Sequence, residues 1–220
     1  MSVFTSSMKV LIPKGRMENA ILESLESRGI AFEKAASRSL YYSGVGVSID
    51  IIPLKSQDIL TYMEKGLADY AILGEDILAE SALNYKVLAP LKMGECRMSL
   101  AGYPYFPLSR QSYLRIASKY PIQAAEVLKD LGIDGEVITL QSSVELAPIL
   151  GFADAILDIV ETGSTLRDNG LVEWFPIRPV TSVLVGRQGI SGQYAEQEML
   201  LSLLLGALPV KKETGYALCG

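Results

Sequence analysis

Short apolar runs of strand length alternate with segments of helical period along most of the 220 residues. The runs predict strands at Lys9–Ile12, Val45–Ile52, Tyr70–Leu73, Met98–Gly102, Leu114–Ala117 and Glu136–Leu140. The helical segments are Met17–Arg28, Ser56–Lys65, Ile77–Ala82, Ile122–Leu131 and the strongly apolar Leu200–Val210. Strands that alternate with helices are typical of α/β architecture with mostly parallel sheets.

One sequence pattern occurs twice. Gly66–Leu73 (GLADYAIL) resembles Gly151–Asp158 (GFADAILD), 85 residues later. The repeat favours two similar α/β lobes with a central ligand cleft, with a chance match of eight positions as the alternative. Because no Gly/Ser/Pro-rich linker separates the halves, we expect crossing strands at Gly94–Gly102 and Ile177–Val185 to join them. The expected bounds are 1–95 plus 180–220 for lobe I and 96–179 for lobe II.

Composition removes several classes of chemistry. The chain has no histidine, which excludes Ser-His-Asp catalysis, His-ligated zinc and a histidine pH switch. Lys and Arg number 20 and Asp and Glu 25, so the net charge of −5 disfavours a basic nucleic-acid surface. Cys96 and Cys219 are too few for a disulfide framework and suit a reducing compartment. No uncharged apolar run reaches the ~18 residues of a membrane span and no signal peptide is evident, so we expect a cytoplasmic protein.

The stretch with the most specific chemistry is Ile156–Leu171, ILDIVETGSTLRDNGL. An apolar strand brings Asp158 and Glu161 to a turn at residues 162–165, and a helical pattern follows. Gly163 allows a positive φ, and successive N–H groups at a helix start, with three hydroxyls nearby, form a cradle for an anion. The two acids could bind sugar hydroxyls or hold Mg²⁺ through water. The loop suits a ribose 5-phosphate, with an ordinary Thr-capped helix start as the alternative.

Three cations stand at positions where α/β folds bind ligands. Lys14 and Arg16 belong to the turn Pro13-Lys14-Gly15-Arg16, between the first strand and the first helix. Arg97 stands within an expected crossing strand, so it should be paired or face the cleft. The alternatives are a solvated basic turn for the first two and a buried salt bridge for Arg97.

Several acidic and hydroxyl groups allow two interpretations each. Asp69 and Asp154, from the repeated Gly-x-Ala-Asp pattern, either terminate turns or contact a ligand. Asp76, after Gly74, either caps the next helix or faces the cleft. The segment Ser142-Ser143-Val144-Glu145 matches a capping box that would start a helix running to Leu150, although such a helix start could also bind an anion.

The chain resembles the ATP phosphoribosyltransferases, specifically their short catalytic form. The resemblance runs from about Lys9 to Val185. It rests on five motifs: PKGR at 13–16, DILTYMEKGLADYAILGEDIL at 58–78, GECRMSLAG at 94–102, ASKYP at 117–121 and SVELAPILGFADAILDIVETGSTLRDNGL at 143–171. The last motif is long and ordered, which makes it the most specific of the five.

The resemblance implies a two-lobed fold like that of type II periplasmic binding proteins, with the active site in the cleft. It implies transfer of the phosphoribosyl group of phosphoribosyl pyrophosphate (PRPP) to N1 of ATP, with release of pyrophosphate. This reaction is the first step of histidine biosynthesis and requires Mg²⁺. The metal would be held through the substrate phosphates, and no metal-ligating residue is assigned.

The resemblance also implies roles for individual residues. In the family the TGxTL loop holds the 5-phosphate of the ribose donor, and the matching residues here are Thr162, Gly163, Ser164, Thr165 and Leu166. Asp158 and Glu161 would lie beside the ribose, and with Arg97 they are the candidate catalytic residues. Lys14, Arg16 and Arg97 would face the nucleotide and phosphates. Together with two of the ambiguous acids above, the candidate ATP or phosphate contacts are Lys14, Arg16, Asp76 and Asp154.

Three positions depart from the usual pattern of the family. Ser142 stands where many members have Gly, and Lys55 and Leu60 stand where Arg and Pro are usual. A lysine lacks the bidentate geometry of arginine, so we expect altered phosphate or effector contacts at Lys55. About 35 residues follow Val185, too few for the histidine-binding domain of longer members. We therefore expect a homo-oligomer that pairs with a regulatory subunit similar to histidyl-tRNA synthetase.

Three other functions share parts of this pattern. A solute-binding protein has the same architecture, but it is exported and does not need an acidic TGST loop. A non-catalytic relative that acts as a regulatory subunit is suggested by the three departures. The ligand-sensing domain of a transcription regulator would need a DNA-binding helix pair, for which the residues before the first expected strand are too few.

Overall fold

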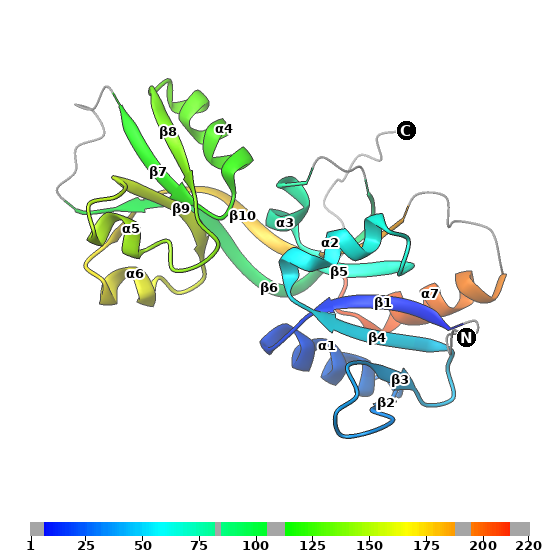
Figure 1. The fold of residues 1–220 in the computed structure, drawn as a ribbon. Helices are drawn as coiled ribbons and strands as arrows, with labels where there is room; N and C mark the ends of the chain where they lie inside the picture. Colours follow the sequence, from blue (N-terminus) through cyan, green and yellow to red (C-terminus); the bar gives the residue numbers. More distant parts are fainter. Residues whose placement is uncertain (1–6, 82–84, 105–112, 188–194, 212–220) are drawn as a thin grey trace. The chain divides into compact units, whose positions relative to one another are not determined.

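The computed structural model describes residues 7–81, 85–104, 113–187 and 195–211, which divide into two units (Figure 1). Unit 1 comprises Met1–Leu78, Leu83–Gly94 and Thr181–Gly220, and unit 2 comprises Ala79–Ala82 and Glu95–Val180. Strands β6 (Lys86–Gly102) and β10 (Val172–Gly186) each continue from one unit into the other. The expected lobe I contained residues 79–82, which the structure groups with unit 2.

The sheet of unit 1 has the strand order β2-β3-β4-β1-β5-β10. Its inner strands β4 (Ile49–Leu54), β1 (Met8–Pro13) and β5 (Tyr70–Gly74) are parallel. Antiparallel pairings join β2 (Phe32–Glu33), β3 (Tyr42–Gly44) and β10 to their neighbours, so the sheet is mixed rather than mostly parallel. The strand expected to begin at Val45 begins at Ile49, because the preceding residues connect β3 to β4 in an antiparallel hairpin.

Side chains on the two faces of β1 belong to two different cores. Val10 and Ile12 are fully buried among side chains of α1 (Arg16–Glu26) and α7 (Ala195–Ala207). Leu11 is buried among side chains of α2 (Ser56–Glu64), and α3 (Glu75–Ala79) follows β5. Helices thus cover both faces of this sheet, as Figure 1 shows, which explains why β1 is apolar at successive positions.

Unit 2 has a smaller sheet of the same kind, with the order β10-β6-β9-β7-β8. Strands β8 (Gly135–Thr139), β7 (Leu114–Ser118) and β9 (Ala155–Val160) are parallel, and β6 is antiparallel to β9. Helix α4 (Pro121–Leu131) packs on one face, and α5 (Leu146–Ile149) and α6 (Ser164–Asp168) lie on the other (Figure 1). The Glu80 carboxylate accepts hydrogen bonds from the amides of Ile122 and Gln123 (2.6 and 3.2 Å), which explains why residues 79–82 belong to this unit.

The strand orders place the two copies of the sequence repeat in equivalent elements. The run β4-β1-β5-β10 of unit 1 corresponds to β8-β7-β9-β6 of unit 2. Ala71 of the first copy pairs with Leu11 on β1, and Ile156 of the second copy pairs with Ala117 on β7. Ala71 and Ile156 are 85 residues apart, which is the offset of the repeat. The predicted fold class, two similar α/β lobes, is confirmed, and the two copies of the repeat occupy equivalent elements.

The aspartates of the repeated Gly-x-Ala-Asp pattern have the same structural role in both units. Asp69 Oδ2 accepts a hydrogen bond from the Lys9 amide (2.8 Å), and Asp154 Oδ2 accepts one from the Arg115 amide (2.9 Å). Each aspartate amide also donates to the carbonyl of that same partner, Lys9 or Arg115. The bonds join the start of one parallel strand to the turn before the next, which is the turn-terminating role.

The segment before α5 does not form the expected capping box. The helix begins at Leu146, and its N-cap residue is Glu145, which makes no side-chain cap hydrogen bond. Ser143 has a positive φ of 48°, which is uncommon for a residue with a side chain. The Leu146 amide donates to the Ser143 carbonyl (3.1 Å) in a turn. The prediction of a helix starting at the two serines is therefore wrong.

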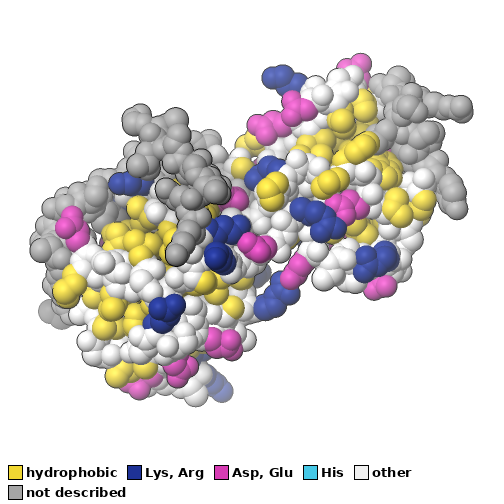
Figure 2. Space-filling model, turned by 180° about the vertical axis from the view of Figure 1, so that it is seen from behind, with side chains coloured by type: hydrophobic (Ala, Val, Ile, Leu, Met, Phe, Trp, Pro, Cys, Tyr) yellow, Lys and Arg dark blue, Asp and Glu magenta, His cyan; other side chains and the backbone are white. Residues whose placement is uncertain are grey.

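The described residues include no helix of the length and apolarity that a membrane span requires. On the face shown in Figure 2, Lys and Arg side chains are scattered among acidic and apolar ones. Cys96 lies half-buried in β6, whereas Cys219 and the last residue of the helix expected at Ile77–Ala82 fall outside the described residues.

Candidate active site

A cavity of about 280 Å³ lies at the carboxyl end of β9, beside the loop that leads to α6. The carboxyl ends of parallel strands are the usual ligand-binding edge of α/β sheets. The cavity is lined by Glu145, Ile156, Asp158, Ile159, Val160, Glu161, Thr162, Gly163, Ser164, Thr165 and Leu166. The structure therefore brings all five residues of the predicted phosphate loop together with Asp158 of β9 and with Glu161, which follows the strand.

Gly163 determines the path of this loop. It has a left-handed backbone (φ 71°, ψ 12°), which costs a residue with a side chain roughly 1–2 kcal/mol. The hydroxyls of Thr162 and Ser164 lie 3.1 Å apart, and the Ser164 amide donates to Thr162 Oγ1 (3.4 Å). Leu166 is buried in the core of unit 2 and anchors the loop at its helical end. Because the first amides of a helix have no partner within it, the loop presents N–H and hydroxyl groups together.

Asp158 is an acid that folding has largely removed from water. It is 8% exposed, its Oδ2 lies 3.2 Å from Lys119 Nζ, and its Oδ1 accepts a hydrogen bond from the Ile159 amide (2.8 Å). Burial raises the pKa of Asp158 above its ordinary value, and the charge of Lys119 opposes this rise. The folded chain therefore binds a proton here more readily than the unfolded chain. The ionised carboxylate costs stability at neutral pH, and the cost is relieved as the pH falls through the folded-state pKa.

We expect Asp158→Asn to reduce activity without reducing stability. Asparagine can still accept the Ile159 hydrogen bond but has no charge to desolvate, so the thermal unfolding midpoint at pH 7 should not fall. The kcat/KM for the ligand of the cavity should fall about tenfold, because a hydrogen bond to an ionised group is lost. Melting curves and initial rates measure the two effects. Asp130→Asn, on an exposed position of α4, controls for the lost charge. A lower midpoint with normal rates would make Asp158 a structural residue.

Arg97, on β6, forms a salt bridge with Glu173, on β10. Its Nε and Nη2 donate to the two carboxylate oxygens (2.6 and 2.5 Å), and the Ser99 hydroxyl donates to the same carboxylate (2.7 Å). The guanidinium holds the pKa of Glu173 below its ordinary value. The remaining nitrogen, Nη1, donates to the carbonyl oxygen of Glu161 (3.2 Å), immediately before the loop. The alternative for Arg97 was a buried salt bridge. The salt bridge forms, but its side chains are 37% and 22% exposed, and Arg97 also bonds directly to the entry of the loop.

Lys14 and Arg16 lie at the corresponding edge of unit 1, where β1 ends and α1 begins. Both are exposed. The Gly15 amide between them donates to Glu18 Oε2 (3.2 Å), so an acid of the same turn occupies this backbone donor. An anion bound at this turn would meet the two cationic side chains rather than the Gly15 amide.

The remaining two candidates do not lie at the loop. Asp76 is buried in the first turn of α3, in unit 1. Asp154 lies at the amino end of β9, roughly 20 Å along the strand from the loop. Its carboxylate accepts hydrogen bonds from Arg115 Nε and Nη2 (3.0 and 2.7 Å). The carboxylate of Asp154 is thus engaged by Arg115 and joins strands, and its predicted phosphate contact stays a prediction.

Lys119 and Glu173 do not line the cavity but hold Asp158 and Arg97, and neither was among the predicted site residues. Lys119 follows β7 as Lys14 follows β1, and it lies within the ASKYP motif at 117–121, a signal that could have indicated it. Glu173 belongs to no recognisable pattern, because it is 76 residues from Arg97 and only the folded sheet brings them together.

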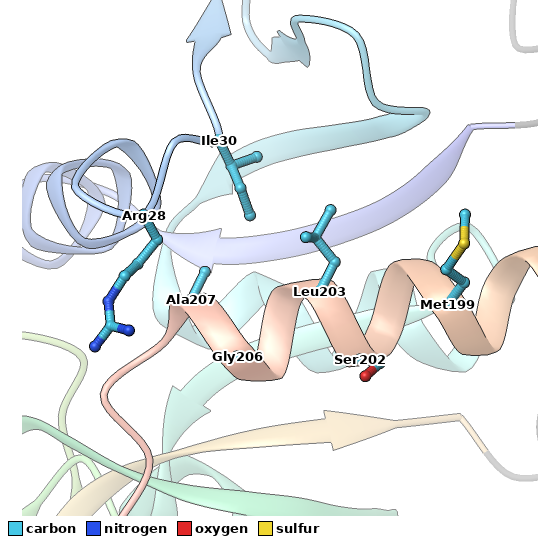
Figure 3. A pocket seen from close by; sticks show the side chains of 7 residues that line it. All are labelled: Arg28, Ile30, Met199, Ser202, Leu203, Gly206 and Ala207. Carbon is cyan, nitrogen blue, oxygen red and sulfur yellow. The ribbon is translucent and has the colours of Figure 1, made fainter.

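A second cavity, of about 570 Å³, lies in unit 1 and has different chemistry (Figure 3). It is lined by Arg28, Ile30, Met199, Ser202, Leu203, Gly206 and Ala207. Figure 3 shows Ile30, which follows α1, and Leu203, on α7, directed toward one another. This mainly apolar lining does not match a phosphorylated sugar, so the cavity at β9 is the candidate active site.

Comparison with known proteins decides the family of the chain. The family model HisG: ATP phosphoribosyltransferase matches residues 55–206. An ATP phosphoribosyltransferase from Clostridium acetobutylicum is 40% identical over 182 residues, covering 81% of this chain and 85% of that protein. The chain belongs to the ATP phosphoribosyltransferase family. It is therefore a transferase of the first step of histidine biosynthesis, in which the phosphoribosyl group of PRPP passes to N1 of ATP.

Solved structures agree with membership of the ATP phosphoribosyltransferase family and with the short catalytic form. The ATP phosphoribosyl transferase (HisG:HisZ) complex from Thermotoga maritima matches with a TM-score of 0.76 and 30% identity, over 91% of this chain and 98% of that chain. The periplasmic VFT2 domain of Bordetella pertussis BvgS matches with a TM-score of 0.57 and 18% identity, over 91% of this chain and 87% of that chain. The second likeness shows the fold alone, and it agrees with the predicted type II periplasmic-binding-protein architecture.

Proposed function

We propose that the cavity at β9 binds the ribose and 5-phosphate of PRPP. The observation that carries this proposal is the arrangement of donors and acceptors around one cavity. The loop at residues 162–165 supplies N–H and hydroxyl donors, which suit phosphate oxygens, and Asp158 and Glu161 supply acceptors, which suit ribose hydroxyls. The volume of about 280 Å³ is at the small end of ligand pockets, which suits a sugar phosphate.

For the acceptor nucleotide, we propose that the phosphates of ATP meet the cations at the carboxyl edge of unit 1. Lys14 and Arg16 are exposed there, and the Lys14 amide donates to the Leu54 carbonyl (2.8 Å), which brings the end of β4 alongside. Lys55, the N-cap residue of α2, follows Leu54 directly and adds a third cation. As a lysine it contributes charge without the bidentate geometry of an arginine.

The reaction requires alignment more than proton transfer. The lone pair of adenine N1 attacks ribose C1 while the bond from C1 to pyrophosphate breaks. Because this lone pair is already available, no histidine base is needed, in agreement with a chain that has none. Fixing the ribose at the loop orients C1 for the attack. The carboxylates of Asp158 and Glu161 stabilise the positive charge that develops on the ribose in an oxocarbenium-like transition state.

Magnesium is the proposed cofactor, held mainly by the substrate phosphates. Within the described ranges, no group of three or more His, Cys, Asp or Glu side chains could hold a metal ion. Mg²⁺ usually keeps several waters and takes one or two carboxylates besides phosphate oxygens. The exposed Glu161 at the cavity fits this need. When bound, the metal would neutralise the charge of the leaving pyrophosphate.

We also propose a HisZ-like regulatory subunit as the partner of this chain, acting with it in the cytoplasm as a hetero-oligomer. The proposal is supported by the likeness to the catalytic chain of a HisG:HisZ complex. Mixing the two subunits should give a complex that elutes earlier from size exclusion than either alone. Pyrophosphate release from ATP, PRPP and Mg²⁺, measured with and without the partner, tests the activity of the pair.

The hydroxyls of the loop provide the direct test of the PRPP site. In the double variant Thr162→Val/Thr165→Val, the side-chain shapes are kept while two hydroxyl donors are lost. We expect the KM for PRPP to rise about tenfold or more, at roughly 1 kcal/mol for each hydrogen bond, while the KM for ATP stays near the wild-type value. Thr61→Val, on the exposed side of α2, is the matched control. Unchanged turnover at low PRPP in the double variant would exclude the loop as the phosphate site.

A further inference from the structure

Two consecutive carbonyl oxygens at the entry of the loop each accept a hydrogen bond from an arginine. Arg97 Nη1 donates to the Glu161 carbonyl (3.2 Å), and Arg167 Nη1 donates to the Thr162 carbonyl (3.0 Å). The two arginines come from different elements, β6 and α6. Successive peptide groups of the loop are thus held from two separate parts of unit 2.

These bonds fix the direction of the next two amides. In a planar trans peptide the C=O and the following N–H point to opposite sides. The bond to Arg97 therefore turns the Thr162 N–H away from Arg97, and the bond to Arg167 turns the Gly163 N–H away from Arg167. Both Thr162 and Gly163 line the cavity. Two backbone donors of residues that line the cavity are thus oriented before any ligand arrives.

Each arginine is itself held in place. Arg97 donates two hydrogen bonds to the Glu173 carboxylate, which also accepts one from Ser99. The backbone amide of Arg167 donates to the Gly163 carbonyl (3.1 Å). The side-chain Nη1 of Arg167 lies 3.1 Å from the position that a Cβ on Gly163 would occupy. The backbone and the side chain of Arg167 therefore both contact the loop.

We propose that Arg97 and Arg167 form a clamp that orients the phosphate loop for PRPP, with Arg167 and Glu173 acting as positioning residues. This inference rests on the proposed function, which places the 5-phosphate of PRPP at the oriented amides. Orienting donors before binding raises affinity by reducing the ordering cost. The clamp therefore acts on the affinity for PRPP and leaves ATP binding and the chemical step unchanged.

The variant Arg167→Met removes one arm of the clamp. We expect the Kd for PRPP from calorimetry to rise about tenfold, as for the loss of one charge-assisted hydrogen bond. The kcat and the KM for ATP should stay within about twofold of wild type, and Arg167→Lys should recover part of the affinity because it restores a donor. Lys129→Met is the matched control, because Lys129 is likewise the basic residue in the last turn of its helix, α4. An unchanged Kd in Arg167→Met would overturn the clamp.

Hydrogen exchange separates failure of the clamp from failure of the proposed function. In the wild type, PRPP should slow exchange of the amides in residues 161–166; absence of this protection would place the phosphate elsewhere and overturn the proposed function. In Arg167→Met without ligand, exchange of the same amides should be faster, and wild-type exchange would count against the clamp. If Arg167→Met does not fold, Glu173→Gln tests the other arm, with the same expected rise in the Kd for PRPP.

Discussion

Replacing Gly163 with valine is expected to reduce kcat/KM for PRPP by about 100-fold or more, the scale of a lost electrostatic stabiliser. Gly163 has a φ of 71°, where a β-branched residue is an outlier. Its Cβ would also lie 3.1 Å from Arg167 Nη1 and 3.7 Å from Val160 Cγ1. Valine therefore changes the path of the loop and displaces one arm of the clamp. Initial rates at varied PRPP and saturating ATP measure the loss.

The matched control for this variant is Gly132→Val. Gly132 ends α4 with a φ of 64°, and a Cβ there would meet no atom within 4 Å. The two valines therefore carry similar backbone strain, roughly 1–2 kcal/mol, but Gly132→Val leaves the loop intact. We expect it to lower the free energy of unfolding while the kinetics stay normal. Equal losses of activity in both variants would mean that Gly163 matters to stability alone.

Arg97→Ala is expected to have an effect of similar size, about 100-fold in kcat/KM. The change removes the donor that holds the Glu161 carbonyl, and it leaves the Glu173 carboxylate without its cationic partner. The pKa of Glu173 should then return toward its ordinary value, because Arg97 is the largest cause of its depression. Steady-state kinetics with each substrate varied in turn will show whether the loss falls mainly on PRPP, as the clamp requires.

The control for Arg97→Ala is Arg115→Ala, because the two arginines make the same kinds of bond. Arg115 donates two hydrogen bonds to a carboxylate, that of Asp154, and one to the Gly151 carbonyl (3.2 Å). Arg115 serves the opposite end of β9. Arg115→Ala should therefore lower stability by as much as Arg97→Ala while PRPP kinetics stay normal. A PRPP-specific loss in Arg115→Ala would instead support the substrate role predicted for Asp154.

Elements with a local pattern could be predicted from the sequence. The strand at Tyr70–Gly74 and the helix at Pro121–Leu131 differ from the expected bounds by a single residue, because apolar periodicity sets both. The phosphate loop could also be predicted, since its glycine, hydroxyls and acids are contiguous. The residues that contact the side chains of the site could not be predicted. Lys119 and Asp158 are 39 residues apart, and only the parallel pairing of β7 with β9 brings them together.

The failure at Ser142–Glu145 has a tertiary cause. The motif satisfies the local rule for a capping box, yet Val144 within it is fully buried in the core of unit 2. The chain turns at Ser143 with a positive φ, and the helix starts only at Leu146. We attribute this late start to the burial of Val144, since packing routinely overrides a local helix preference.

The division of the chain has a consequence for its synthesis on the ribosome. Unit 2 is almost entirely one continuous piece, Glu95–Val180, whereas unit 1 needs segments from before and after it. Leu184 and Val185 of β10, together with Leu204, complete the cores of unit 1. These side chains are translated only after all of unit 2 has been made. Domains usually fold in order from the N-terminus. Here unit 1, whose first segment is translated first, is the unit completed last.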